Sequence, residues 1–272
     1  MYEMKKCMIC LPVRTYNRYL DRVFENIESM KRIMLSKGYE VSVCVYGDKS
    51  VNKEGVKWLE EKEELKYRTW RIAKGRNELM SEVFKNDTEL HIMMDGDEVC
   101  AGELNADVLL KYLDREDWDC LSFNRVGYYD IWALQYEPYI HHAWGLNNER
   151  LNRRLVENMR SDIIQRLSEL NEGELMECYS AFNGFAIYRT KCFEGIVYDG
   201  ETQKYFSEER LAEYLKEMEK RLNISGLALQ EPTENRRGPV SAYENCEHIS
   251  FHLGAIRKNG ARIRIAKECL FV

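Results

Sequence analysis

The residues best suited to chemistry are two aspartates, Asp95 and Asp97, which directly follow the apolar run 91–94. An apolar run that stops at two carboxylates separated by one glycine is typical of a buried strand that ends at a site. Side chains alternate along an extended chain, so both carboxylates are expected on the same side of it. Gly96 leaves room for a ligand to approach the backbone. Such a pair suits Mg²⁺ or Mn²⁺ shared with phosphate oxygens. The alternative is a polar turn in which Asp97 only caps the next helix.

Composition argues against several classes of partner. The 272 residues are 44% hydrophobic, enough for a full core in one large domain or two small ones. The net charge is −6 and no basic stripe is present, which argues against nucleic acid. The longest apolar runs have the length of strands, so no membrane-spanning segment is predicted, and the N-terminus is expected to form a first strand rather than a signal peptide. The nine cysteines lie in scattered apolar contexts, which predicts buried thiols in a reducing, cytoplasmic setting.

The first hundred residues alternate between strand and helix patterns. This alternation predicts the α/β class, with a single mixed, mainly parallel sheet flanked by helices. Ligands bind beyond the carboxyl ends of parallel strands, so Arg14, Asp48 and the pair Asp95 and Asp97 are expected to share one site. The predicted strands are 7–12, 40–46, 67–70 and 90–94, and the predicted helices are 18–37, 53–65 and 75–84.

The second half has longer charged helices and fewer strands. Four-residue spacing of apolar side chains from Leu151 to Leu167 predicts one buried helical stripe. No linker separates the two halves, so we expect a single domain, 1–272, with a nucleotide-sugar-binding half, 1–100, and an acceptor half, 101–272, that carries helical insertions near 147–172 and 202–239. The predicted strands are 119–124, 179–188 and 262–265, the helices are 147–172, 207–222 and 246–258, and 230–239 is a loop.

Four segments, 11–15, 46–48, 71–77 and 94–97, resemble in their order along the chain the nucleotide-sugar-binding half of glycosyltransferases with the GT-A fold. Met-Asp-Gly-Asp at 94–97 is similar to the DxD motif of that superfamily, and Arg76-Asn77 is similar to the residues that open the preceding helix. The other two segments are Leu-Pro-Val-Arg-Thr at 11–15 and Tyr-Gly-Asp at 46–48. Later segments, at 129–132, 183–186 and 246–248, are similar to acceptor-side motifs of small GT-A enzymes, including a branch found in large DNA viruses.

The resemblance implies a donor site in the first half. A departing nucleoside diphosphate needs its charge neutralised, which Mn²⁺ or Mg²⁺ can do, and basic residues near a helix N-terminus add to this. A solvated basic face is the alternative for these residues. Asp48 is implied to accept hydrogen bonds from uracil, with a turn aspartate as the alternative. The implied donor-binding residues are Pro12, Arg14, Thr15, Asp48, Arg71, Lys74, Arg76, Asn77, Asp95 and Gly96.

The third protein ligand of the metal is predicted to be His248, beside Asp95 and Asp97. Asn245 is a good N-cap for a helix whose buried stripe begins at Ile249, which puts His248 in the first turn. The Glu-His pair also matches the resembling enzymes. A neutral imidazole favours Mn²⁺ over Mg²⁺. His252, one turn further along, is the rival ligand, and a helix-surface histidine is the remaining alternative.

The acceptor side is expected around Asp130, which lies among aromatic residues that suit a sugar face. Asp130 is predicted to bind the acceptor or to act as general base, and Glu247 is the rival base. The alternative for Glu247 is that it only stabilises the N-terminus of its helix by interacting with the helix dipole. Many GT-A enzymes have an acidic pair where this chain has Cys246-Glu247-His248, so a retaining or inverting outcome stays open. The resemblance implies that the acceptor is bound by Tyr129, Trp132, Asn183 and Gly184.

These features predict a metal-dependent glycosyltransferase that moves a sugar from a nucleotide-diphosphate donor, a UDP-sugar, to a hydroxyl of a glycan or glycoconjugate. Two alternatives stay open. A nucleotidyltransferase also pairs metal-binding aspartates with a nucleotide fold, but it normally has a glycine-rich loop after the first strand, and 11–15 contains no glycine. A non-catalytic nucleotide- or carbohydrate-binding module would bind UDP without releasing it from a sugar donor.

Overall fold

The computed structural model describes residues 4–62, 65–201, 205–229 and 244–272. Its strands are β1 (Lys5–Pro12), β2 (Tyr39–Gly47), β3 (Lys57–Glu60), β4 (Leu90–Met94), β5 (Cys120–Asn124), β6 (Leu175–Cys178), β7 (Phe185–Arg189) and β8 (Ile263–Cys269). Its α-helices are α1 (Leu20–Ser36), α2 (Arg68–Lys85), α3 (Ala106–Leu113), α4 (Glu149–Glu169), α5 (Glu208–Leu222) and α6 (Glu247–Asn259), and its short 3₁₀ helices are η1 (Lys49–Val51), η2 (Glu98–Cys100) and η3 (Thr190–Phe193).

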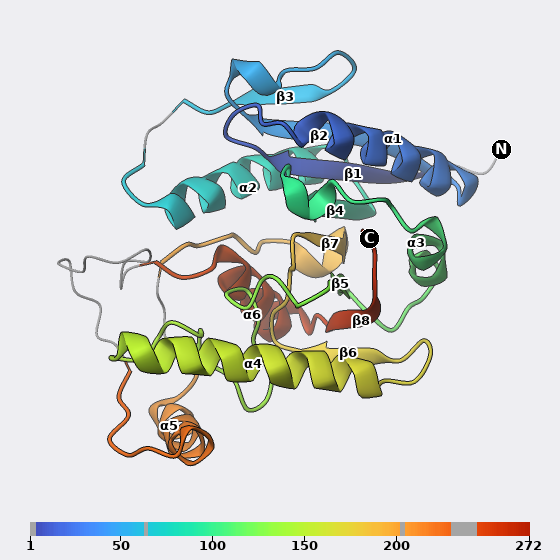
Figure 1. The fold of residues 1–272 in the computed structure, drawn as a ribbon. Helices are drawn as coiled ribbons and strands as arrows, with labels where there is room; N and C mark the ends of the chain where they lie inside the picture. Colours follow the sequence, from blue (N-terminus) through green and yellow to red (C-terminus); the bar gives the residue numbers. More distant parts are fainter. Residues whose placement is uncertain (1–3, 63–64, 202–204, 230–243) are drawn as a thin grey trace.

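All eight strands form one sheet in the order β3-β2-β1-β4-β7-β5-β8-β6 (Figure 1). The strands β1 to β4 run parallel to one another. β7 is antiparallel to both of its neighbours, β4 and β5, while β5 and β8 are parallel and β6 is antiparallel to β8. The predicted mixed, mainly parallel sheet flanked by helices is confirmed. Six strands therefore end at the same edge, which is where the predicted carboxylates follow β4.

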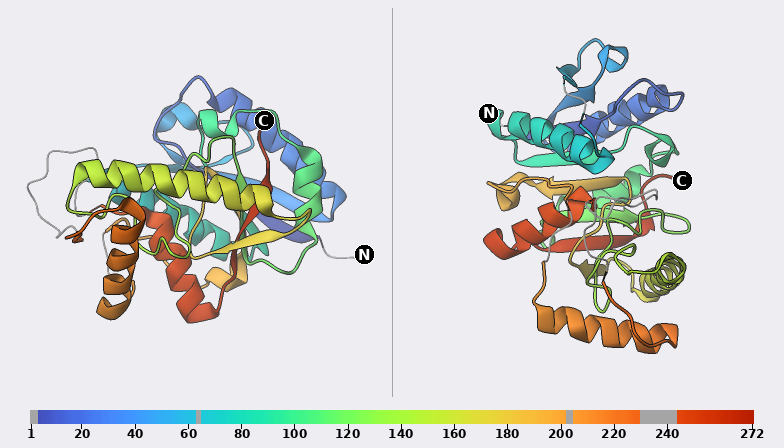
Figure 2. Two further views of the ribbon diagram at one scale, coloured as in Figure 1. Left: turned by 60° about the horizontal axis from the view of Figure 1, so that its bottom comes forward. Right: turned by 90° about the vertical axis from the view of Figure 1, so that its left-hand side faces the viewer.

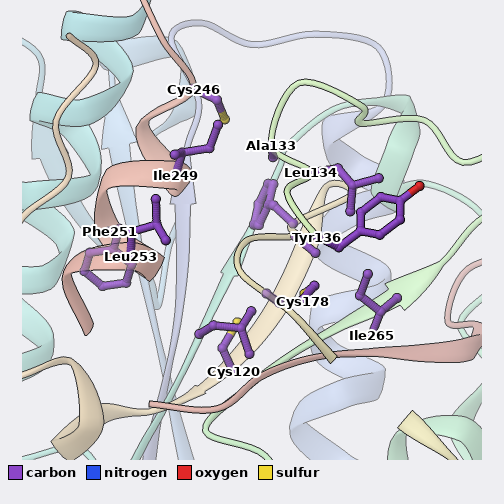
Figure 3. Close-up of a cluster of buried hydrophobic side chains, with 14 of the residues drawn as sticks. Cys120, Ala133, Leu134, Tyr136, Cys178, Cys246, Ile249, Phe251, Leu253 and Ile265 are labelled. Carbon is purple, nitrogen blue, oxygen red and sulfur yellow. The ribbon is translucent and has the colours of Figure 1, made fainter. Parts of the chain in front are cut away.

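Helices cover both faces of this sheet, and two hydrophobic clusters fill the space between. One cluster joins α1 and α3 to one face, and the other joins α2, α4 and α6 to the opposite face. Figure 2 shows α1 and α3 on one side of the sheet and α2 and α6 on the other. Figure 3 shows part of the second cluster, where Phe251 and Leu253 of α6 lie near Cys120 of β5.

The period of two along β1 divides its side chains between these clusters. Cys7 belongs to the cluster under α1, and Cys10 belongs to the cluster under α2. The two thiols of the Cys-x-x-Cys sequence thus point to opposite faces of the sheet and cannot bind one ion together. All cysteines except Cys192 and Cys269 are buried, and burial raises the pKa of the Cys44 thiol to about 12. No helix in the described part of the chain has the length and apolar character needed to cross a membrane.

Two elements of the first half differ from their predictions. The predicted helix 53–65 is absent from the described residues of that segment, 53–62 and 65, which contain the edge strand β3, whose four residues pair with β2. As an edge strand it has one paired neighbour and an open side, so its charged residues stay in solvent. The segment 67–70 is not a strand but the beginning of α2, because Arg68 is already helical. Arg76 and Asn77 therefore lie in the middle of a helix rather than at its N-terminus.

In the second half, the predicted strand 179–188 is correct only for residues 185–188, which belong to β7. Residues 179–184 form the loop between β6 and β7, in which Asn183 (φ 54°) and Gly184 (φ 87°) adopt left-handed backbone conformations that a strand cannot contain. Helix α3 was not predicted, since it has only eight residues. The N-cap of α6 is Cys246 rather than Asn245, whose Oδ1 accepts a hydrogen bond from Cys246 N instead. The loop predicted at 230–239 lies outside the described residues.

Candidate functional site

A cleft of about 360 Å³ opens at the sheet edge where β1, β4 and β5 end. The loops after these strands line it together with α2 and the start of α6. The predicted site residues in its lining are Pro12, Arg14, Thr15, Arg76, Asp95, Gly96, Asp97, Tyr129, Asp130, Trp132, Glu247 and His248. The lining residues that sequence reasoning missed are Val13, Asn17, Arg68, Ile72, Phe182 and Cys246. Most of these adjoin a predicted residue, and Arg68 was hidden by its assignment to a strand.

Inside this cleft, Arg76 contacts carboxylates from two distant parts of the sequence. Its side chain is only 4% exposed, its Nε donates to Glu247 Oε1 at 2.9 Å, and its Nη2 donates to Asp95 Oδ1 at 3.3 Å. The guanidinium carbon lies 4.7 Å from the ring centre of Phe182, a cation–π contact. Nη1 is buried and has no hydrogen-bond partner among the described residues. Arg76 thus fixes two carboxylates and keeps one donor group unused.

Asp95 is the first carboxylate after β4, and 26% of its side chain is exposed in the cleft. Burial raises its pKa to about 7; the Arg76 guanidinium opposes this rise, and the carboxylates of Asp97 and Asp130 add to it. Its backbone N–H donates to the carbonyl of Gly184 at 2.9 Å, which continues the β4–β7 pairing by one residue. Asp95 is therefore a carboxyl group that changes protonation near neutral pH.

Asp97 combines the two roles that the sequence left open. Its Oδ1 accepts a hydrogen bond from Val99 N at 3.0 Å and so caps η2, while the residue also lines the cleft. Gly96 between the carboxylates is required for packing, because a Cβ atom there would lie 2.2 Å from Cγ2 of Val13. The side chain of Val13 occupies the space that the glycine leaves.

Asp130 approaches the cleft from the loop after β5. Its backbone N–H donates to Asn183 Oδ1 at 3.0 Å, and its Oδ1 accepts from Ala133 N at 3.1 Å. Asn183 in turn donates through Nδ2 to the carbonyl of Phe123 at 3.0 Å. Burial raises the pKa of Asp130 to about 6. Asn183 is not in the lining of the cleft; its contacts hold Asp130 against the end of β5.

Gly184, also predicted to contact the acceptor, lies behind the cleft as well. A Cβ atom at this position would meet Val99 Cγ1 at 2.2 Å and its φ is 87°, so both space and backbone conformation require glycine. Tyr129 and Trp132, by contrast, line the cleft, and Tyr129 is 52% exposed. The loop after β5 thus contributes both aromatic side chains and the Asp130 carboxylate to the cleft.

Of the two histidines of α6, only His248 lines the cleft. Its ring stacks on Phe182 at 3.8 Å, and its Nε2 is buried, lies 3.8 Å from Glu247 Oε1 and has no hydrogen-bond partner in the described chain. Both nitrogens of His252 have partners inside the protein, Ser180 at Nδ1 and Tyr188 at Nε2. Burial lowers the pKa of both imidazoles, that of His252 to about 3.

Four predicted donor-binding residues are not in the lining of the cleft. Asp48 Oδ1 accepts from Ser50 N at 2.8 Å and caps η1, as the turn alternative anticipated. Arg71 lines an adjoining cavity of about 220 Å³ that shares Pro12, Val13 and Arg14 with the cleft. Lys74 and Asn77 line a separate hollow beside Tyr198, and Asn77 makes two hydrogen bonds to the backbone of Tyr198, each of 2.8 Å.

The residues around His248 could supply some, but not all, of the ligands of a divalent cation. Within the described residues, no group of three or more His, Cys, Asp and Glu side chains is close enough to hold a metal ion, so Asp95, Asp97 and His248 do not form a ready three-ligand site. Two carboxylates and the unpartnered Nε2 of His248 nevertheless line one cleft. That donor set suits a cation that takes its remaining oxygen ligands from a bound diphosphate and water.

Comparison with known proteins finds no family model and no curated protein that matches the sequence. One similar solved structure is a glycosyltransferase involved in the glycosylation of the major capsid of PBCV-1, with a TM-score of 0.24, 10% identity and 44% of this chain covered. The chain spans about half, 52%, of the length of that protein.

Two further similar structures are of Drosophila β1,4-galactosyltransferase 7. A mutant in complex with manganese, UDP-Gal and xylobiose has a TM-score of 0.30 and 13% identity, with coverage of 94% of this chain and 74% of that one. The catalytic domain in complex with xylobiose has a TM-score of 0.32 and 11% identity, with coverage of 98% and 95%. All three structures are glycosyltransferases.

Proposed function

We propose that this protein is a metal-dependent glycosyltransferase that moves a sugar from a UDP-sugar to a hydroxyl group of a glycan or glycoconjugate. The observation that carries the proposal is the convergence of Asp95, Asp97, Asp130 and Glu247 on one cleft around the buried Arg76. Carboxylates can hold a cation that neutralises a departing diphosphate, and a separate carboxylate can take a proton from an acceptor hydroxyl.

The donor side of the cleft is proposed to lie along Asp95, Asp97 and the loop after β1. A bound Mn²⁺ or Mg²⁺ would neutralise the charge of the departing diphosphate, with Asp97, Asp95 and His248 as its protein ligands. Arg14 and Arg68, both exposed side chains in the cleft lining, supply positive charge for phosphate oxygens. The adjoining cavity that contains Arg71 supports a place for the nucleobase next to them.

On the acceptor side, Asp130 is proposed as the general base. A pKa of about 6 leaves this carboxylate largely unprotonated at neutral pH and still close enough to the working pH to take a proton from an acceptor hydroxyl. The Oε1 atom of its rival Glu247 already accepts a hydrogen bond from Arg76 Nε at 2.9 Å in a buried ion pair. Tyr129 and Trp132 offer aromatic faces for the acceptor sugar.

The proposal is tested by incubating the full-length protein with a panel of UDP-sugars and GDP-sugars, with Mn²⁺ or with EDTA, and measuring the release of nucleoside diphosphate. We expect release of UDP from one UDP-sugar with Mn²⁺, and none with EDTA. Binding of UDP without release from any donor would instead make the protein a binding module. Formation of pyrophosphate from a nucleoside triphosphate and a sugar phosphate would make it a nucleotidyltransferase.

A further inference from the structure

A line of buried polar groups leads from the cleft into the core behind it. His248 Nδ1 lies 3.5 Å from the hydroxyl of Tyr188, that hydroxyl lies 3.1 Å from His252 Nε2, and His252 Nδ1 lies 2.9 Å from Ser180 Oγ. All four residues have zero exposed surface. The outer end of the line is His248 Nε2, which faces Glu247 and lacks a hydrogen-bond partner among the described residues.

Packing holds the hydroxyl of Tyr188 in the middle of this line. The Tyr188 ring stacks on His91 with ring centres 4.6 Å apart and planes 1° apart, and Phe193 packs edge-on at 5.0 Å. Tyr188 also belongs to β7, which is paired with β4 on one side and β5 on the other. The ring therefore has no room to turn away from the two histidines.

The number of protons restricts how these groups can bond to one another. Each neutral imidazole carries one N–H, and Tyr188 carries one O–H. His248 Nδ1 and His252 Nε2 cannot both accept the single proton of Tyr188. When that proton is donated to either imidazole, the four groups are fully hydrogen-bonded in only two arrangements, with both imidazoles protonated at Nε2 or both protonated at Nδ1. In the first, every donor points toward the cleft, and in the second every donor points away from it.

Glu247 selects between the two arrangements in the free protein. Its Oε1 lies 3.8 Å from His248 Nε2. A carboxylate oxygen attracts an N–H at that atom and repels a lone pair. The arrangement with both imidazoles protonated at Nε2 is therefore favoured when no cation is present.

We propose that Tyr188 and His252 are positioning residues that fix the tautomer of His248, so that the free protein presents its Nε2–H to the cleft as a hydrogen-bond donor. A lone pair on that atom, which a metal ion needs, becomes available only when both imidazoles change tautomer together. Groups that no ligand touches thus determine what His248 offers to a ligand. This inference rests on the contacts within the chain and does not depend on the proposed glycosyl transfer.

The test is nuclear magnetic resonance of the full-length protein labelled with ¹⁵N-histidine, at neutral pH and without metal or nucleotide. Two-bond ¹H–¹⁵N correlations identify the protonated nitrogen of each ring, and the variants His248→Gln and His252→Gln assign the signals. We expect both residues to be protonated at Nε2. Opposite tautomers in the two rings, or both rings protonated at Nδ1, would overturn the proposal. No ligand is added, so a protein without transferase activity still gives a decisive result.

A second experiment tests the role of Tyr188 with a variant. Tyr188→Phe removes the acceptor for His252 Nε2–H, and Ser180 Oγ at 2.9 Å is a better remaining acceptor than Cys120 Sγ at 3.7 Å. We expect His252 to become protonated at Nδ1. Tyr214→Phe is the matched control, because it removes a buried hydroxyl that has no partner within the described residues, and it should leave both rings unchanged. An unchanged His252 in folded Tyr188→Phe would refute the role of Tyr188, and the unmodified protein tests the proposal even if this variant does not fold.

Discussion

Arg76 and Glu247 lie 171 positions apart in the sequence and meet as a buried ion pair, with Arg76 Nε donating to Glu247 Oε1 at 2.9 Å. Their side chains are 4% and 6% exposed. Because the same guanidinium also contacts Asp95, this pair joins the carboxylate after β4 to the carboxylate that begins α6. The pair places charged groups in the cleft and holds together two of the elements that line it.

Replacing Arg76 by Met should lower the free energy of unfolding by about 3–5 kcal/mol, because it leaves a buried carboxylate without its partner. Urea denaturation measures the loss. The double variant Arg76→Met/Glu247→Gln should be less destabilised than the single one. As a control, Arg153→Met breaks an ion pair whose two side chains are each 68% exposed, and it should cost under about 0.5 kcal/mol. Equal losses in the two single variants would contradict the prediction.

Binding of UDP should depend on Mn²⁺, and this dependence should be lost in Asp97→Asn. The asparagine keeps an oxygen that can accept from Val99 N and cap η2, so the variant removes the charge and little else. Calorimetric titration of UDP with Mn²⁺ and with EDTA measures the effect. Asp107→Asn, in the first turn of α3, is the control and should behave like the unmodified protein. Identical UDP affinity of the unmodified protein in Mn²⁺ and in EDTA would reject the metal site.

The same titration decides between the histidines. His248→Ala should weaken Mn²⁺ binding in the UDP complex more than His252→Ala does, because only His248 lines the cleft. A loss confined to His252→Ala would move the ligand by one helical turn. No loss in either variant would show that neither histidine binds the metal.

Asp130→Asn should reduce the rate of sugar transfer by about 10²–10⁴-fold and leave UDP affinity unchanged. The asparagine retains an oxygen for Ala133 N, so the loop should keep its conformation. Initial rates with a saturating donor, together with UDP titration, separate the two effects. Normal transfer in this variant, combined with loss of transfer in a folded Glu247→Gln, would assign the base to Glu247.

Stability and activity should both respond to pH through Asp130. Its pKa is raised from 3.8 to about 6 in the folded protein. Between these values the native state binds more protons than the unfolded state, so this group's contribution to the free energy of unfolding falls as pH rises through that window. Asp130→Asn should therefore lose stability less steeply than the unmodified protein over the window. Transfer by the unmodified protein should increase as pH rises through about 6, and parallel stability curves for the two proteins would contradict the assignment.

Local patterns were sufficient to predict the strands that carry the cleft. The continuous apolar run before Asp95 indicates a strand buried on both faces, and the four-residue stripe of α4 indicates a helix buried on one face, so β4 and α4 are found close to the expected positions. The edge strand β3 was missed because its charged residues need no buried face. The beginning of α2 was missed because Tyr67 and Trp70 favour strands in isolation, whereas Thr69 is buried and bonded to Glu244.

The site was predicted less completely, since its main contact depends on topology. Arg76 was expected at or near a helix N-terminus, as part of an anion site, but α2 begins two turns earlier and buries it. Its contact with Glu247 exists only because α6 packs beside α2 on the same face of the sheet. Sequence spacing carries no information on that arrangement. Asn183 supports Asp130 rather than lining the cleft for the same reason, because β7 is inserted between β4 and β5.

The insertion of β7 also determines how the molecule can move. Five consecutive residue pairs, from Leu90 with Arg189 to Met94 with Phe185, lock the strand of the first half that leads to Asp95 onto a strand of the second half. A hinge motion that separates the two halves would have to break this ladder of paired residues, so the paired strands oppose such a motion. Any change in the aperture of the cleft must come from its rim, in particular from the segments 13–19 and 125–132. Asp95 directly follows this paired strand, whereas Asp130 lies in the second of these rim segments.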